Sequence, residues 1–351
     1  MQPEVLDPRP AGDTPAGEAT SSGLLRRIVG GNRGEGPRRH SLLERYGGLM
    51  LLGAMVVVFA ITLPGKFLTY DNLIGVVSNQ TIGGIMALAL LLPLAAGVFD
   101  ISIGGAMTLA VVLITWLFQT TGGAIPIPAA IILTLLIGPL IGAVNGALVL
   151  RGRVDPFIAT IAVSSVLLGL SEMIANGTTI SKDIPTSFTD LGRTFTLKVP
   201  LTVAYVAAVA IMLWYVLDQT PFGRRVYATG AARDAARLVG VRTNRVIFLA
   251  FVASATLATL AGIVYAARIG SGPPNVGAGY LLPAFAAAFL GSTMIRPGRF
   301  NVPGLILALF IVAIGINGLQ LYGIPFWITD LYQGVVLIAA VLVARSRTRK
   351  T

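Results

Sequence analysis

The sequence predicts an all-α integral membrane protein with about ten transmembrane helices. Of its 351 residues, 55% are hydrophobic and only 12% are charged, whereas a soluble domain carries about 25% charged residues. The mean hydropathy is +0.81. These polar residues are too few to form the surface of a soluble protein of this size, so lipid must cover much of the chain.

The polar N-terminal segment, residues 1–45, is expected to be a disordered tail. It is rich in Pro, Gly, Arg and Glu and has little apolar periodicity, so it cannot bury enough apolar surface to fold. It also lacks the small-residue cleavage site of a secretory signal, and the first apolar run is expected to be an uncleaved anchor. A transmembrane domain is expected over 46–345, followed by a short basic tail, 346–351.

The predicted spans are apolar runs of the length that crosses a bilayer, which is about 20 residues. Residues 101–150 contain no charged side chain and form two spans, separated by a turn at 122–126. Small residues within the runs indicate close helix packing, and Pro93 and Pro139 are expected to kink or break their helices. The remaining runs are 47–65, 73–99, 156–174, 199–217, 247–267, 280–294, 302–321 and 326–344.

The distribution of Lys and Arg predicts that both termini are cytoplasmic. With ten spans, the loops 151–155, 218–245 and 296–299 lie on the same side as the arginine-rich C-terminus, and basic residues concentrate in cytoplasmic loops. A nucleic-acid partner would need the net charge of +11 gathered on one soluble face, which is not the pattern here. The basic residues expected on the outer side are Lys66, Lys182, Arg193, Lys198 and Arg268.

The residue inventory argues against an enzyme. The chain has no cysteine and a single histidine, His40, in the polar tail, so neither cysteine metal sites nor histidine chemistry is expected. A phosphate-binding G-x-x-x-x-G-K-[ST] motif is also absent from the sequence. We therefore expect no catalytic residue, no metal site and no cofactor bound by this chain.

The longest polar loop between spans, 218–245, contains a predicted short helix over 231–239. These residues are good helix formers, and Gly240 is a natural stop. Arg233 and Arg237 lie on one face, with Asp234 beside them. Because so short a helix is marginal alone, it either docks into a cleft of a soluble partner or belongs to a solvated basic loop. The face that would enter a cleft is formed by Ala232, Ala235, Ala236 and Val239.

A set of residues in this loop, with three other stretches, resembles one family. The loop residues are Thr220, Gly223, Arg224, Tyr227, Ala228, Gly230, Asp234, Ala235, Ala236, Arg237, Leu238, Gly240 and Val241; the other stretches are 100–104, 152–160 and 267–280. Together they resemble the membrane-spanning permease subunits of ribose-type sugar ABC importers, a family that includes branched-chain amino acid permeases. The similarity covers about 45–345. The chain departs from that family at Ala232, at 281–283 and at 291–299, where the family has a glycine-rich run.

The resemblance implies an ABC importer permease that moves a sugar or sugar-like solute across the bacterial inner membrane by alternating access. It implies three partners: a second permease copy in a homodimer, an extracytoplasmic solute-binding protein and an ATPase subunit that carries ATP and Mg²⁺. A self-sufficient secondary carrier is the alternative; it would need buried ionisable groups, and Asp100, Glu172 and Asp330 are expected near span ends. The residues implied in coupling to the ATPase are Gly223, Arg224, Tyr227, Gly230, Asp234, Ala235, Ala236, Arg237 and Gly240.

Polar residues within the apolar runs are candidates for the transport path. Asn79, Gln80, Asn145 and Asn317 must face protein or water, because an amide facing lipid loses its hydrogen bonds; helix–helix hydrogen bonding is the alternative. Arg268 is either a docking residue for the binding protein or an interfacial anchor. At the start of the third span, Asp100 either stabilises the helix N-terminus or lines the path. Its neighbours in that motif are Ser102 and Gly104.

Overall fold

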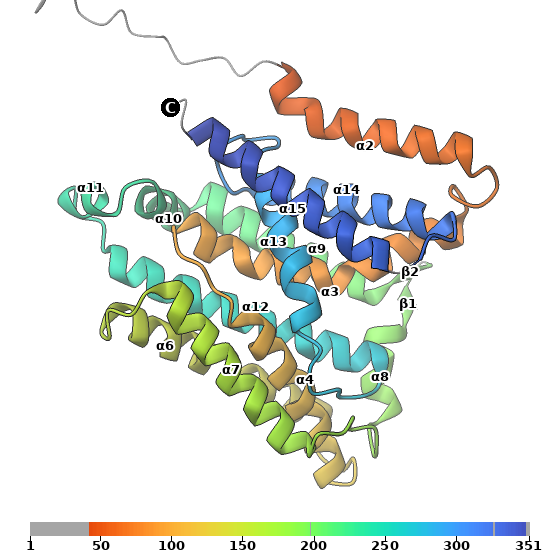
Figure 1. The fold of residues 1–351 in the computed structure, drawn as a ribbon. Coiled ribbons are helices and arrows are strands. Elements are labelled where there is room, and N and C mark those ends of the chain that lie inside the picture. The colour runs from red at the N-terminus through yellow and green to blue at the C-terminus, as the bar shows by residue number, and fades with distance from the viewer. Residues whose placement is uncertain (1–41, 197, 326, 349–351) are drawn as a thin grey trace, which may run out of the picture. The chain divides into compact units, whose positions relative to one another are not determined.

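The computed structural model describes residues 42–196, 198–325 and 327–348, and these are almost entirely helical (Figure 1). The predicted all-α fold class is confirmed. The elements are α2 Leu42–Thr62, α3 Tyr70–Ala95, α4 Ile103–Thr120, α5 Ile127–Leu135, α6 Ile137–Leu150, α7 Pro156–Ala175, α8 Thr186–Arg193, β1 Phe195–Thr196, β2 Val199–Pro200, α9 Leu201–Trp214, the π-helix η1 Tyr215–Gln219, α10 Pro221–Ala231, α11 Arg233–Leu238, α12 Thr243–Ile269, α13 Ala278–Ser292, α14 Val302–Leu321 and α15 Trp327–Thr348.

Every predicted span is helical, and two of them are each divided between two helical elements. Among the described residues, seven helical segments are long and apolar enough to cross a membrane, and α2, α13 and α15 contain shorter apolar stretches. The first described helix, α2, begins at Leu42, four residues before the predicted domain start, and the rest of the predicted tail lies outside the described residues. At the other end, α15 continues to Thr348 into the predicted basic tail, of which 349–351 also lie outside them.

Proline is expected to disturb two of the spans. The fourth predicted span is two helices, α5 and α6, which are separated at Leu136. Pro139 follows this break and cannot donate a hydrogen bond to the carbonyl of Leu135 four residues earlier, so a helix is disfavoured at this point. Pro93 lies inside α3, two residues before the helix ends at Ala95. The expected break therefore occurs before Pro139, whereas α3 continues through Pro93 to its end.

The buried centre of the molecule is formed by α12 with α3, α4 and α6. Small residues permit this packing. A Cβ atom on Gly142 of α6 would lie 2.4 Å from the Cα of Val252, and one on Gly138 would lie 2.5 Å from the Cα of Thr256. In lipid, such close backbone approach replaces the hydrophobic drive that holds helices together in water.

The two ends of α12 carry different structures (Figure 1). Near its C-terminal end lie α8 and the loop after α12, which is joined to the segment after α7 by a bridge between Ile180 and Gly272. A short β1–β2 hairpin connects α8 to α9. The N-terminal end of α12 carries α10 and α11, which form the 218–245 loop with η1. The candidate site residues are distributed over both ends and the buried centre.

Candidate functional site

Two glycines fix the position of α10 within the 218–245 loop. The helix begins at Pro221, after Thr220 accepts a hydrogen bond from the Gly223 N–H at 3.3 Å. A Cβ on Gly223 would lie 2.0 Å from the carbonyl oxygen of Leu217, and one on Gly230 would lie 2.2 Å from that of Ala95. The predicted Gly223 and Gly230 are therefore packing positions that hold α10 against η1 and against the end of α3.

The predicted helix over 231–239 is wrong in its extent. Ala231 ends α10, Ala232 has an extended backbone with φ −157° and ψ 94°, and α11 covers only Arg233–Leu238. The predicted stop is confirmed, since Gly240 has φ +87°. Its N–H donates to the Arg237 carbonyl and the next N–H, of Val241, donates to Ala236, which is the two-bond pattern of a Schellman end.

Hydrogen bonds between α11 and the start of α12 accompany the break at Ala232. Arg233 and Arg237 both donate to Oδ1 of Asn244, at 3.2 and 2.8 Å, and Arg237 also donates to Oγ1 of Thr243 at 2.9 Å. These contacts hold α11 against the N-terminus of α12. The exposed Asp234 lies 3.9 Å from Arg237, which makes only a weak pair. The two guanidinium groups thus stabilise the loop itself.

The exposed apolar surface of α11 differs from the predicted one. Ala236 is buried, whereas Ala232 and Ala235 are exposed. Leu238 and Val239, at the end of the helix, are 89% and 80% exposed. Of the predicted four-residue face, Ala232, Ala235 and Val239 are therefore exposed and Ala236 is not, so a bulky residue at Ala236 would disturb the loop before it met any partner. The large apolar side chains on this surface are Leu238 and Val239, which we call the α11 tip.

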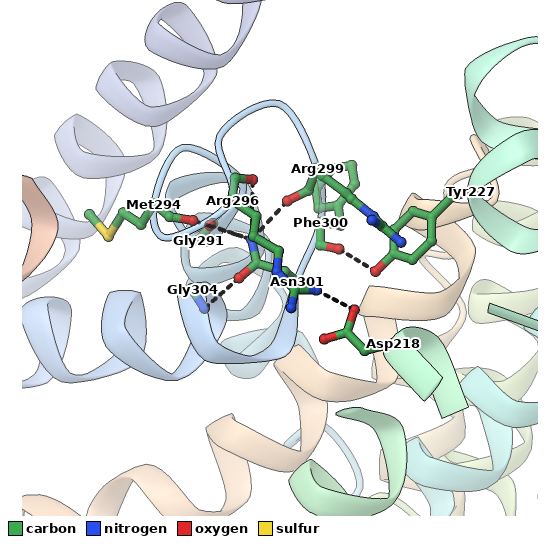
Figure 2. Close-up of polar contacts among 9 residues, drawn as sticks. All are labelled: Asp218, Tyr227, Gly291, Met294, Arg296, Arg299, Phe300, Asn301 and Gly304. Carbon is green, nitrogen blue, oxygen red and sulfur yellow. Dashed lines mark hydrogen bonds and ion pairs between the residues drawn. The ribbon is translucent and has the colours of Figure 1, made fainter. Parts of the chain in front are cut away.

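A second loop, residues 293–301 between α13 and α14, is bound to the first (Figure 2). The Tyr227 hydroxyl donates to the Phe300 carbonyl at 2.7 Å, and the Arg299 guanidinium lies 3.5 Å from the centre of the Tyr227 ring. Arg296 forms an ion pair with the nearly buried Asp218 at 2.5 Å. Burial raises the pKa of Tyr227, and Arg299 offsets part of this rise, so the hydroxyl is a neutral donor at physiological pH.

The 293–301 loop is shaped by Asn301 (Figure 2). Its amide nitrogen lies within hydrogen-bond distance of four backbone carbonyls, among them Arg299 at 2.9 Å and Met294 at 3.2 Å, and its Oδ1 accepts from the Gly304 N–H at 2.8 Å. Of the residues that join the two loops, the sequence analysis identified only Tyr227 as a site residue. It missed Asp218, Arg296, Arg299 and Asn301, although the departure from the family pattern at 291–299 was a signal that this loop is specialised.

At the other end of α12, Arg268 and Asn79 are brought together. Nη2 of Arg268 donates to Oδ1 of Asn79 at 2.8 Å, and Nη1 donates to the Ser78 carbonyl at 2.6 Å. Arg193 in turn donates to the Arg268 carbonyl at 2.8 Å. The guanidinium of Arg268 therefore binds α3, and the residue predicted for docking meets one predicted for the transport path. The neighbouring Gln80 is half-buried.

The other two path candidates make helix–helix hydrogen bonds. Asn317 of α14 and Asn72 of α3 exchange amide hydrogen bonds at 2.8 and 3.0 Å. Asn145 of α6 donates to the Ser102 hydroxyl at 2.7 Å. Both contacts agree with the alternative given for these residues, which is hydrogen bonding between helices and not exposure to the transport path.

Asp100 belongs to a buried polar cluster. Asp100 and Ser102 are fully buried, and Oδ1 of Asp100 accepts from the Ser102 N–H at 3.0 Å and from its hydroxyl at 2.6 Å. Among the described residues, Oδ2 of Asp100, Oδ1 of Asn145 and Oγ of Ser254 are buried without a hydrogen-bond partner. At the start of α4, the Gly104 carbonyl would lie 1.9 Å from a Cβ on Gly277, so this turn abuts the loop after α12.

The comparisons with known proteins agree with the helical arrangement. A family model described as a branched-chain amino acid transport system permease component matches residues 72–341. The ribose import permease protein RbsC of Escherichia coli is 32% identical over 83% of this chain and 91% of its own length. The Bacillus subtilis protein of the same name is 31% identical, covering 88% and 94%.

A third relative is named for the import of a different solute. The autoinducer 2 import system permease protein LsrD of Salmonella paratyphi A is 28% identical over 85% of this chain and 92% of its own length. No solved structure is significantly similar to the chain. The matches cover nearly the whole predicted transmembrane domain, including both ends of α12.

Proposed function

The chain belongs to the family of branched-chain amino acid transport system permease components, which are multi-pass membrane transport subunits and not enzymes, and we propose that it is the permease of an ATP-driven ABC importer. The solute would be a sugar or a sugar-like molecule, because the relatives that match it include ribose import permeases. The ATPase would be a separate subunit that holds ATP and Mg²⁺.

The observation that carries the proposal is the α11 tip. Leu238 and Val239 are almost fully exposed on a helix that lies outside the candidate spans. Complete burial of such a side chain contributes about 1.5–3 kcal/mol, so this surface is suited to a protein partner. Arg233 and Arg237 hold the helix in place before any partner binds, which lowers the entropy lost on docking.

The contacts of the 218–245 loop provide a route for motion into the membrane domain. Asp218 and Tyr227 connect it to the 293–301 loop, which joins α13 to α14. Gly230 contacts the end of α3. A push on α11 by an ATPase would therefore act on three spans besides α12. This arrangement supports alternating access driven from the 218–245 side, with both termini on that side in the cytoplasm.

The remaining partners follow from the same proposal. A second permease copy would complete the transport path, and an extracytoplasmic solute-binding protein would deliver the solute at the α8 end of α12. The chain itself would bind no cofactor. The membrane would be the bacterial inner membrane.

A secondary carrier is the second candidate, and the buried Asp100 is the observation that favours it. A buried acid with an unpartnered oxygen is a feature of proton or ion relays in transporters. The two functions differ in their energy source, so reconstituted vesicles separate them. Sugar uptake should require the ATPase subunit and ATP and should persist when an ionophore collapses ion gradients. If uptake occurs without the ATPase and is abolished by the ionophore, the chain is a secondary carrier.

A further inference from the structure

A basic cavity and an apolar groove meet beside the N-terminal half of α12. The cavity has a volume of about 710 Å³ and is lined by Arg225 of α10 and by Arg242 and Arg245 at the start of α12. The groove has a volume of about 420 Å³ and runs between η1 and α12. Phe222 and Leu249 line both spaces, so the two are continuous.

The three arginines are free to bind an anion. All three side chains are exposed, and within the described ranges none has a carboxylate partner or a side-chain hydrogen bond. The other arginines of the same loop differ: Arg233 and Arg237 are occupied by Asn244. Three guanidinium groups around one cavity are opposite in charge to a phosphate group and can donate several charge-assisted hydrogen bonds to its oxygens.

The groove has the chemistry of an acyl-chain site. Its lining includes Met212, Leu213, Val216, Ala253 and Leu257, and these apolar side chains leave little to bind a polar ligand. Residues 245, 249, 253 and 257 follow each other at helical spacing along one face of α12. The distance from Arg245 to Leu257 along the helix is about 18 Å, close to the depth of one hydrocarbon leaflet, which is about 15 Å.

A second apolar cavity, of about 760 Å³, lies on the other side of Arg245. Its apolar lining comes from α6 and from Phe248 of α12, its polar end is formed by Arg151, Asn244 and Arg245, and it shares Arg245 and Leu249 with the basic cavity. Two mainly apolar spaces thus adjoin one basic site, which is the arrangement that a two-chain lipid requires.

We propose that this composite site binds one anionic phospholipid, with its phosphate among Arg225, Arg242 and Arg245 and its acyl chains in the two apolar spaces. Basic pockets between membrane helices bind anionic headgroups. The lipid would cover the surface between η1, α10 and α12 and would reach Val239 of the α11 tip, which lines the basic cavity. This proposal does not depend on the proposed transport function.

The test uses the full-length chain in neutral detergent with equimolar phosphatidylglycerol and phosphatidylcholine, and mass spectrometry of the lipid that co-purifies. Phosphatidylglycerol should be enriched. Replacing Arg225, Arg242 and Arg245 by Gln should lower its affinity on the order of a hundred-fold. The control, with Gln at Lys66, Lys182 and Lys198, removes equal charge from exposed positions elsewhere and should keep the enrichment.

A second variant tests the groove without changing charge. Ala253→Phe fills the half-buried groove wall and should reduce retention of phosphatidylglycerol. Equal retention of both lipids by the wild type, or enrichment that survives the triple Arg substitution, would overturn the proposal. So would an Ala253→Cys chain that forms a disulfide-linked dimer in membranes, because a second copy would then cover the groove.

Discussion

Asp218 and Arg296 form an ion pair between two loops that lie 78 positions apart in the sequence. Asp218 follows α9, and Arg296 precedes α14. The carboxylate is nearly buried and the guanidinium is half-exposed, so the pair contributes more to geometry than to stability. It makes the 218–245 loop and the α13–α14 connection move together.

Breaking this pair should uncouple the two loops. Asp218→Asn keeps the side-chain shape but removes the charge, and the free energy of unfolding should fall by roughly 1 kcal/mol, because solvent screens only the Arg296 side of the pair. ATP hydrolysis by the partner should then proceed with less solute uptake. The exchange Asp218→Arg with Arg296→Asp should restore part of the uptake. Full uptake by Asp218→Asn would show that the pair does not transmit motion.

The bond between Arg268 and Asn79 should be measurable as a coupling energy. Arg268→Ala and Asn79→Ala remove the same hydrogen bond, so their effects on the free energy of unfolding should be non-additive by about 0.5–3 kcal/mol. Arg268→Glu tests docking of the binding protein separately. If the two Ala substitutions have additive effects and Arg268→Glu weakens docking of the binding protein, Arg268 contacts the binding protein and does not stabilise α3.

Tyr227 should contribute a pH-dependent increment to stability. Tyr227→Phe keeps the ring beneath Arg299 but loses the hydrogen bond to Phe300, which costs about 0.5–1.5 kcal/mol. Because the folded pKa of Tyr227 is raised, this contribution is complete below the unfolded pKa of about 10 and is lost as pH rises through the folded value. Thermal unfolding of both proteins between pH 7 and pH 11 should therefore show a difference that narrows only at the alkaline end.

Much of the fold could be predicted because lipid imposes a simple pattern. Apolar runs of about 20 residues must become helices, so the predicted spans match the helices from α2 to α15. The break at Leu136 was also readable from Pro139. Small residues predicted close helix packing, but no sequence pattern identified Val252 of α12 as the residue on which Gly142 packs.

The site was less predictable because its contacts join different elements of the fold. The Ala-rich pattern of 231–239 favoured one helix, but Arg233 and Arg237 bind Asn244 and draw α11 onto α12, and this contact accompanies the break at Ala232. Burial of Ala236 is also a tertiary effect. Charged residues such as Arg296 and Asp218 lie in separate loops, and helical periodicity carries no information about their pairing.

The orientation of the chain can be tested directly, since it has no cysteine. Ser187 at the α8 end and Ala231 at the opposite end are both exposed. A cysteine at Ser187 should react with an impermeant maleimide added outside intact cells, and one at Ala231 should react only after the membrane is opened. The reverse labelling would invert the topology and place the α11 tip away from any cytoplasmic ATPase.

The central claim is that the α11 tip binds the ATPase, and co-purification measures it most directly. Leu238→Ser with Val239→Ser should abolish co-purification of the ATPase and coupled uptake. It should change the free energy of unfolding of the membrane domain by no more than about 0.5 kcal/mol, because both side chains are exposed. The matched control is Phe195→Ser with Val199→Ser, at exposed apolar positions of the β1–β2 hairpin, and it should keep the ATPase. Normal complex formation and normal uptake by the Leu238 and Val239 variant would contradict the account.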